Sequence, residues 1–265
     1  MGRVRTYEAG TYMLNRNMTN TQVHHILRGS RTGQAPEEVI TVLEGWTIRD
    51  MAAYFESREF FSAEGFIYVA ENGHFPFSFL LDVPDRPNRL EGYLFPDTYR
   101  IPVNPTPGDI IERMLRRFDG IFDIHKRDRA YELGFSMDDI VIMASIIERE
   151  TRLAHERPLV SSVIHNRLDI DMPLQMCSTV AYVLDVQRDR LTNEDLEYDS
   201  PYNTYNVQGF PIGPISNPGA AALHAALWPA DSEYLFFVLT NVETGEHYFS
   251  RTHEEHRAAD RSARE

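Results

Sequence analysis

Apolar positions between residues 136 and 151 recur with the period of an α-helix. Ser136 precedes Asp139 by three residues, which is the spacing of a capping box at a helix start. Four later residues follow the i, i+3, i+4, i+7 pattern and so share one helix face, namely Val141, Ala144, Ser145 and Glu148. The pattern predicts a helix of small and apolar residues that carries a carboxylate near its end.

Similar periodicity and start signals predict helices elsewhere in the chain. Their expected starts are Thr19, Thr47, Ser62, Thr106, Glu156, Ser178, Asn217 and Thr252. Alternating or β-branched runs predict strands at 8–14 and 38–43, and a hairpin formed by 234–241 and 246–250. Residues 197–219 are dense in Tyr, Asn, Pro and Gly, and an irregular stretch of this length is usually functional.

Together these elements predict an α+β fold with two parts. Residues 1–45 form a small βααβ-like unit in this interpretation, and residues 46–265 form a larger mixed α/β domain. A unit of about 45 residues buries little apolar surface by itself. We therefore expect it to pack on the larger domain or to act as a binding module.

Charge and composition narrow the classes of partner. The chain of 265 residues carries 40 acidic and 26 basic residues, for a formal net charge of −14. This balance argues against nucleic acid as a partner, because binding phosphates requires a basic face. Cys177 is the single cysteine, so no disulfide can form within the chain. No apolar run approaches the ~18 residues of a membrane span, and the start has no signal-peptide apolar region, so we expect a cytoplasmic protein or a chain cut free of an anchor.

Glu148 is the first candidate for chemistry, because its helix face offers space and apolar neighbours. Apolar surroundings favour the protonated form of a carboxyl group. A protonated carboxyl group in a cleft can deliver a proton to a glycosidic oxygen. The alternative is structural, in which Glu148 simply marks the exposed end of a core helix.

Several separated motifs follow one another in order along the chain. The longest are LEGYLFPDTY at 90–99 and ASIIERET at 144–151, and the others lie at 10–12, 44–47, 166–168, 172–175, 178–180, 202–205, 209–211 and 214–219. Each motif is weak alone, but the ordered set resembles the YceG-like family of endolytic murein transglycosylases over about residues 10–257.

The resemblance implies an enzyme at the outer face of the bacterial cytoplasmic membrane that cuts nascent peptidoglycan strands internally. It would cleave the MurNAc–GlcNAc β-1,4 bond and leave a 1,6-anhydroMurNAc end, without a cofactor or a metal. It also implies a LysM-like module in residues 1–45, peptidoglycan strands as substrate and cell-wall synthases as partners. The family normally carries an N-terminal membrane helix, and we expect that anchor to be missing from this chain.

Within this resemblance Glu148 matches the catalytic glutamate and would act as both acid and base. One carboxyl group suffices because the sugar's own 6-hydroxyl is the nucleophile and is delivered intramolecularly. Glu150 lies two residues further, about 200° around a helix, and should point away from this face. We expect it to pair with Arg149 or Arg152, or to pack at the helix end.

Other residues are candidates for contact with sugar: Gln175, Ser178, Thr179, Asn203, Tyr205, Asn206, Glu91, Tyr99 and Ser145. Amide and aromatic side chains on the long loop suit sugar recognition by hydrogen bonds and stacking. Each candidate also has a structural alternative. Ser178 occupies a position suited to a helix N-cap, the loop residues could tie the loop to itself, and Glu91 and Tyr99 lie beside a turn marked by Gly and Pro.

Two other functions stay open at the level of sequence. The first is a glycoside hydrolase, or muramidase, in which Asp97 or Asp171 activates water as a second carboxylate. The second is a non-catalytic protein that only binds glycan. The run HEEH at 253–256 lacks the His spacing of a zinc helix, and Cys177 has no accompanying Cys–His–Asn signature, so we expect it to be a small buried residue.

Overall fold

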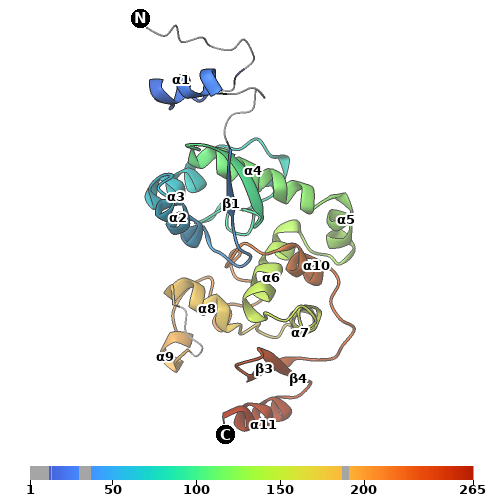
Figure 1. Ribbon diagram of the computed structural model, residues 1–265. Helices are drawn as coiled ribbons and strands as arrows, with labels where there is room; N and C mark the ends of the chain where they lie inside the picture. Colours follow the sequence, from blue (N-terminus) through green and yellow to red (C-terminus); the bar gives the residue numbers. More distant parts are fainter. Residues whose placement is uncertain (1–11, 13, 30–36, 187–190, 265) are drawn as a thin grey trace, which may run out of the picture.

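Two small antiparallel sheets accompany a mainly helical chain in the computed structural model, which describes residues 12, 14–29, 37–186 and 191–264 (Figure 1). One sheet pairs β1 (Glu37–Thr41) with β2 (Thr98–Pro102), and the other pairs β3 (Phe236–Asn241) with β4 (Glu246–Ser250). The predicted α+β fold is confirmed. The expected strand at 8–14 lies almost wholly outside the described residues.

Helices form most of the regular structure in the described chain. In order they are α1 (Asn20–Gly29), α2 (Ile48–Ser57), α3 (Ala63–Asn72), the 3-10 helix η1 (Ser78–Leu81), α4 (Pro107–Ile121), α5 (Ile124–Glu132), α6 (Met137–Glu150), α7 (Arg157–Asp169), α8 (Cys177–Leu184), α9 (Asn193–Leu196), α10 (Ala220–Leu227) and α11 (His253–Arg264). No helix in this part of the chain combines the length and the apolar character needed to cross a membrane.

Capping boxes set the starts of the helices that build the core. Thr47 accepts a hydrogen bond from the backbone of Asp50 at the start of α2, and the Asp50 carboxylate accepts one in return. Ser136 and Asp139 do the same for α6. Each box satisfies backbone N–H groups that have no partner within the helix. The starts predicted at Thr47 and Ser136 are therefore confirmed.

Helix α6 lies at the centre of the hydrophobic core. Nine of its 14 residues are buried, including the continuous run from Ile140 to Ile147. Figure 1 shows α2, α3 and α4 on one side of α6, and α7, α8 and the β3–β4 hairpin on the other. Because neighbours surround the helix, the side chains of its last turn meet residues from distant parts of the sequence.

Strand β1 ties the N-terminal region to the larger part of the chain. It runs antiparallel to β2, with Ile40 opposite Tyr99. Just after β1, the backbone of Gly45 donates to Asn217, and the backbone of Asn217 donates to Trp46. This pairing joins residues 37–46 to elements of the second predicted domain. The division at residue 45 stays a prediction.

Four elements, β2, η1, α5 and α9, were not predicted from the sequence. Helix α5 is mostly polar, and Ala130 is its only residue described as buried, so it carries almost no apolar periodicity. Strand β2 follows a turn motif and depends on β1, which lies more than fifty residues earlier in the chain. Both elements are therefore set by tertiary contacts rather than by a local pattern.

Candidate active site

Glu148 lies in the last turn of α6, where the ends of three helices meet. Its Oε1 accepts a hydrogen bond from Arg157 Nη2 at 2.8 Å, and its Oε2 accepts one from the backbone N–H of Gly219 at 3.0 Å. Arg157 is the first residue of α7, and Gly219 is the N-cap of α10. The Glu148 side chain is only 6% exposed, so the protein itself supplies its polar partners.

These surroundings correct the expectation of purely apolar neighbours for Glu148. The residues that share its helix face are indeed buried, and Ser145 donates to the Ile142 carbonyl while accepting from the backbone of Ile215. The polar partners come instead from α7 and from the start of α10. Helical periodicity describes only one helix, so it could not reveal a cation supplied by another.

Glu44 places a second carboxylate beside Glu148. Its Oε2 lies 4.0 Å from Arg157 Nη2, and its side chain is 49% exposed. The Glu44 carboxyl group also lies over Gly219, where a Cβ atom would come within 1.8 Å of Glu44 Oε1. Partial burial and the nearby Glu148 raise the pKa of Glu44, and Arg157 opposes this shift. The site thus combines two carboxyl groups and one guanidinium.

Glu44 is not among the site residues predicted from the sequence. Its signal was present in the motif at 44–47, where the carboxylate precedes a glycine between a strand and a helix. Gly45 has a φ of +79°, a conformation that glycine adopts without steric cost. Of the two carboxylates considered from sequence, Asp97 pairs with Arg117 at 2.6 Å, and Asp171 is exposed.

A buried hydrogen-bond cluster fixes the start of α7 and therefore Arg157. Glu156 accepts hydrogen bonds from Thr151 at 2.9 Å and from the backbone of His247 at 2.9 Å. The Nδ1 atom of His247 lies 2.7 Å from Glu156 Oε2. Burial opposes ionisation of Glu156, but the hydrogen bonds from His247 and Thr151 lower its pKa. The ionised Glu156 links α7 to β4.

Glu150 was expected to pair with Arg149 or Arg152, or to pack at the helix end, and the structure gives it a contact with α8 instead of an ion pair with either arginine. Its Oε1 accepts a hydrogen bond from the backbone N–H of Ser178 at 3.2 Å, in the first turn of α8. The N-cap of α8 is Met176, which has no side-chain cap, so the expected N-cap role of Ser178 is wrong. Glu148 and Glu150 consequently contact different helices.

Three proposed sugar contacts are fully buried, and their hydrogen bonds are internal. Thr179 donates to the Met176 carbonyl, and its hydroxyl lies 3.0 Å from that of Thr204. Asn203 donates to two loop carbonyls, those of Leu196 and Tyr198. Together with Ser145, described above, these residues have no exposed polar atoms to offer a sugar. Their placement corrects the expectation of direct contact and supports the structural alternative.

Glu91 is also buried, at the junction of three segments. It accepts hydrogen bonds from the backbone of Ile48, from the Tyr182 hydroxyl at 3.3 Å and from the Asn217 side chain at 2.6 Å. Burial raises the pKa of Glu91 to about 8, although these hydrogen bonds lower it. Tyr99 is likewise buried, in β2, and its hydroxyl donates to the Phe95 carbonyl. Both placements contradict direct sugar contact and favour structural roles.

Gln175, Tyr205 and Asn206 keep accessible surface. Gln175 is exposed, and its backbone donates to the Thr204 carbonyl. Asn206 is exposed as well, while the Tyr205 hydroxyl lies 3.0 Å from the Cys177 sulfur. These three residues therefore remain candidates for contact with substrate.

Cys177 is exposed, not buried as expected. Partial burial of its sulfur and the nearby Glu150 carboxylate raise the pKa of this thiol, and the hydrogen bond with Tyr205 opposes the shift. The thiol therefore lacks the activation of a catalytic cysteine. In the run at 253–256, His256 stacks on the ring of Phe236 and on His253, and the ring of His253 is tilted against Phe236. Within the described residues, no group of three or more acidic, His or Cys side chains could hold a metal ion.

The fold and the site define an α+β protein whose central helix ends in a carboxylate, beside a second carboxylate and an arginine. The YceG-like family model matches residues 1–262, so the chain belongs to the YceG-like family. The family predicted from the sequence motifs is thereby confirmed.

Named relatives agree with this assignment. The chain is 34% identical to the endolytic murein transglycosylase of Bacillus subtilis over 96% of its own length and 72% of that protein. It is 28% identical to the endolytic murein transglycosylase of Streptococcus pneumoniae R6, but it spans only 49% of that relative's length. A crystal structure of a yceG-like protein from Listeria monocytogenes matches with a TM-score of 0.75 and 33% identity, covering 95% of this chain and 85% of the other.

Proposed function

We propose that this protein is an endolytic peptidoglycan lytic transglycosylase with Glu148 as its acid and base. The relatives named endolytic murein transglycosylases support the reaction class. The observation that carries the choice of residue is the position of Glu148, on the central helix, with a guanidinium at 2.8 Å and a second carboxyl group nearby. Such a group of charges can hold, release and recover a proton.

In the proposed reaction Glu148 protonates the oxygen that bridges MurNAc to GlcNAc, and the bond from C1 to that oxygen breaks. The 6-hydroxyl of the same MurNAc attacks C1, and Glu148 takes up the hydroxyl proton. The new C1–O6 bond closes a 1,6-anhydro ring, so the step consumes no water. Because the nucleophile belongs to the substrate, a second carboxylate is not required.

The neighbours of Glu148 suit both halves of this cycle. After proton donation, Arg157 and the N–H of Gly219 at the start of α10 stabilise the carboxylate. Partial burial and Glu148 raise the pKa of Glu44, so this carboxyl group binds a proton more readily than a fully hydrated one. We therefore assign Glu44 a supporting role in holding the proton at the site.

The presence of two carboxyl groups, those of Glu148 and Glu44, also favours a second candidate, a two-carboxylate muramidase. In that enzyme Glu44, rather than Asp97 or Asp171, would activate water or attack C1. The product separates the two functions, because hydrolysis adds one water and leaves a reducing MurNAc end. A third possibility, glycan binding without catalysis, predicts no product at all.

The proposal also extends to the surroundings in which the enzyme acts. Peptidoglycan lies outside the cytoplasmic membrane, so we place the activity at the outer face of that membrane, next to cell-wall synthases. We further propose that residues 1–45 act as a LysM-like glycan-binding module. Gln175, Tyr205 and Asn206 are the sugar contacts that we retain, because all three keep accessible surface.

Mass spectrometry of products from uncrosslinked glycan strands tests this function. We expect wild-type protein to release fragments with 1,6-anhydroMurNAc ends, and Glu148→Gln to lower product release by at least about 100-fold. Glu132→Gln, at an exposed position on α5 with 64% of its side chain accessible, is the matched control and should cleave normally. Reducing ends would favour the muramidase, and equal product from Glu148→Gln would exclude Glu148.

A further inference from the structure

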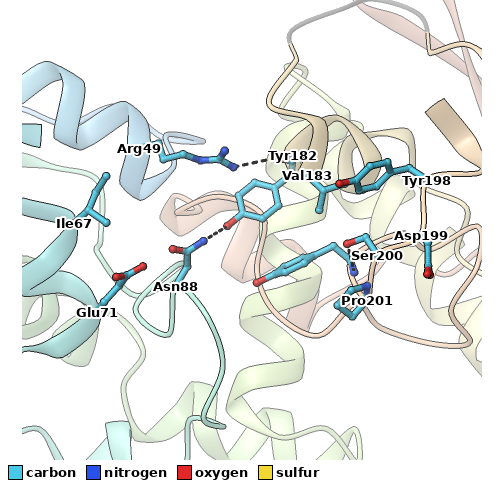
Figure 2. Close-up of a pocket in the computed structure, with 11 residues that line it drawn as sticks. Arg49, Ile67, Glu71, Asn88, Tyr182, Val183, Tyr198, Asp199, Ser200 and Pro201 are labelled. Atoms are coloured by element: carbon cyan, nitrogen blue, oxygen red, sulfur yellow. Dashed lines mark hydrogen bonds between the residues drawn. The ribbon is translucent and has the colours of Figure 1, made fainter. Parts of the chain in front are cut away.

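An open cavity of about 500 Å³ lies to one side of the buried core (Figure 2). Helices α2 and α3 line one wall, with Arg49, Ile67 and Glu71. The end of α8 and the segment 198–202 line the other wall. Its volume falls within the range of small-molecule sites, which is about 300–1,000 Å³. Glu148 is not among its lining residues, so the cavity is separate from the carboxylate pair.

The walls of the cavity hold aromatic faces beside polar groups. Tyr182, Tyr198 and Tyr202 all line it. The hydroxyl of Tyr202 is buried, and its ring contacts that of Tyr182. Asn88 donates to the Tyr182 hydroxyl at 3.2 Å, as Figure 2 shows. Flat apolar faces next to hydroxyl and amide groups suit a sugar ring, which has an apolar face and a polar edge.

Charge in the cavity disfavours an anionic ligand. Among the described residues, Arg49 is the one cation that lines the cavity, and it already donates to the Tyr182 carbonyl at 3.0 Å and pairs with Asp185 at 3.4 Å. Glu71 and Asp199 add two carboxylates to the lining. A ligand with its own carboxylates would meet repulsion there, whereas a neutral sugar would not.

Each wall of the cavity belongs to a segment that also contacts a carboxylate in the last turn of α6. On one side, Gly45 lies against Glu148, and Arg49 follows four residues later, in the first turn of α2. On the other side, Ser178 contacts Glu150, and Tyr182 follows one turn along α8. One turn of helix advances about 5.4 Å, which is close to the length of one sugar unit. A strand that leaves Glu148 between these walls would therefore reach the cavity within a few sugars.

We propose that this cavity is a distal subsite that binds a neutral N-acetylated sugar ring of the glycan strand. This inference rests on the proposed function, because the strand must also reach Glu148. Tyr198 supplies a stacking face, since it is 48% exposed, and the polar groups of the lining bind hydroxyl and acetamido groups. A subsite at this distance favours cleavage inside a strand over cleavage at its end.

Calorimetric titration with β-1,4-linked N-acetylglucosamine tetramer tests the subsite. The protein is the full chain carrying Glu148→Gln, so that binding is measured without cleavage. Adding Tyr198→Ala should weaken binding about three- to tenfold through loss of stacking. Tyr131→Ala, the same change at an 86% exposed tyrosine on α5, should leave binding unchanged. Tyr198 is exposed enough that circular dichroism should report an unchanged fold.

The outcomes separate the subsite from the proposed function. Equal binding by the Tyr198→Ala and Tyr131→Ala variants, or no binding of the tetramer at all, would overturn the subsite. A stem peptide with a free amino group that displaces the tetramer from the cavity would also overturn it. If Tyr198→Ala weakens binding but wild-type protein yields reducing ends, the subsite holds and the transglycosylase reaction fails.

Discussion

The carboxylates of Glu44 and Glu148 both lie near Arg157, but their surroundings differ. Glu148 is 6% exposed and has a hydrogen bond at each oxygen, whereas Glu44 is 49% exposed and has only the longer approach to Arg157. The rigid group suits transfer of a proton to a fixed substrate atom, because catalysis depends on position. The more exposed group suits exchange of protons with solvent. Activity should therefore depend on where Glu44 lies as well as on its charge.

Gly219→Ala should move Glu44 without unfolding the protein. The backbone φ of Gly219 is −78°, which alanine adopts freely, and the nearest obstruction is the end of the Glu44 side chain. We expect cleavage to fall about 10- to 100-fold, and the free energy of unfolding to change by less than about 1 kcal/mol. Product release and urea unfolding measure the two effects.

Gly120→Ala is the control for that change, because its Cβ would meet no atom within 4 Å. It should leave cleavage unaltered. If Gly219→Ala keeps full cleavage activity although Glu44 is displaced, Glu44 has no role in the reaction.

At the scale of elements, α8 depends on a neighbouring helix for its first turn. Its N-cap residue Met176 provides no side-chain hydrogen bond, and Glu150 of α6 accepts from Ser178 instead. A carboxylate at a helix start is favoured by the helix dipole. Because Tyr182 lies one turn further on, this contact also positions the wall of the cavity.

Glu150→Ala should destabilise the protein by about 1 kcal/mol, the typical effect of losing a helix cap. Urea denaturation followed by circular dichroism measures the loss. Glu132→Ala on α5 removes an exposed glutamate that pairs with Arg129 and should change stability by less than about 0.5 kcal/mol. Equal stability of both variants would show that Glu150 does not cap α8.

At the scale of the whole molecule, a buried polar cluster joins three segments. Glu91 accepts from the start of α2, from Tyr182 of α8 and from Asn217 before α10. Asn217 in turn accepts from the backbone of Gly92 and Leu94 through its side-chain oxygen. The cluster fixes the start of α2, α8 and the segment before α10 relative to one another, and so positions the walls of the cavity that carry Arg49 and Tyr182.

Stability should therefore fall as the pH rises from about 4.5 to about 8. The pKa of Glu91 rises from 4.5 to about 8 on folding, so the unfolded chain loses this proton first and folding becomes less favourable through that window. The expected slope in the middle of the window is about 1.4 kcal/mol per pH unit. Below pH 4.5, Glu91 is protonated in both the folded and the unfolded state, and its full contribution to the free energy of unfolding is present.

Urea unfolding at pH 5, 6.5 and 8 tests this dependence. Glu91→Gln cannot ionise and should remove that part of the slope, leaving the contributions of other groups. A variant with the same slope as wild-type protein would mean that Glu91 is ionised in the folded state.

The local pattern of the sequence determined the central helix, its capping box and the place of Glu148 on it, because a helical period and a cap depend only on near neighbours. The ordered motifs determined the family. Tertiary structure alone decided the partners of that carboxylate. Arg157, Gly219 and Glu44 come from separate elements, and no local period records their meeting. Tertiary packing also buried Thr179, Asn203 and Glu91. A polar residue in a motif can form its hydrogen bonds with the backbone as readily as with a ligand.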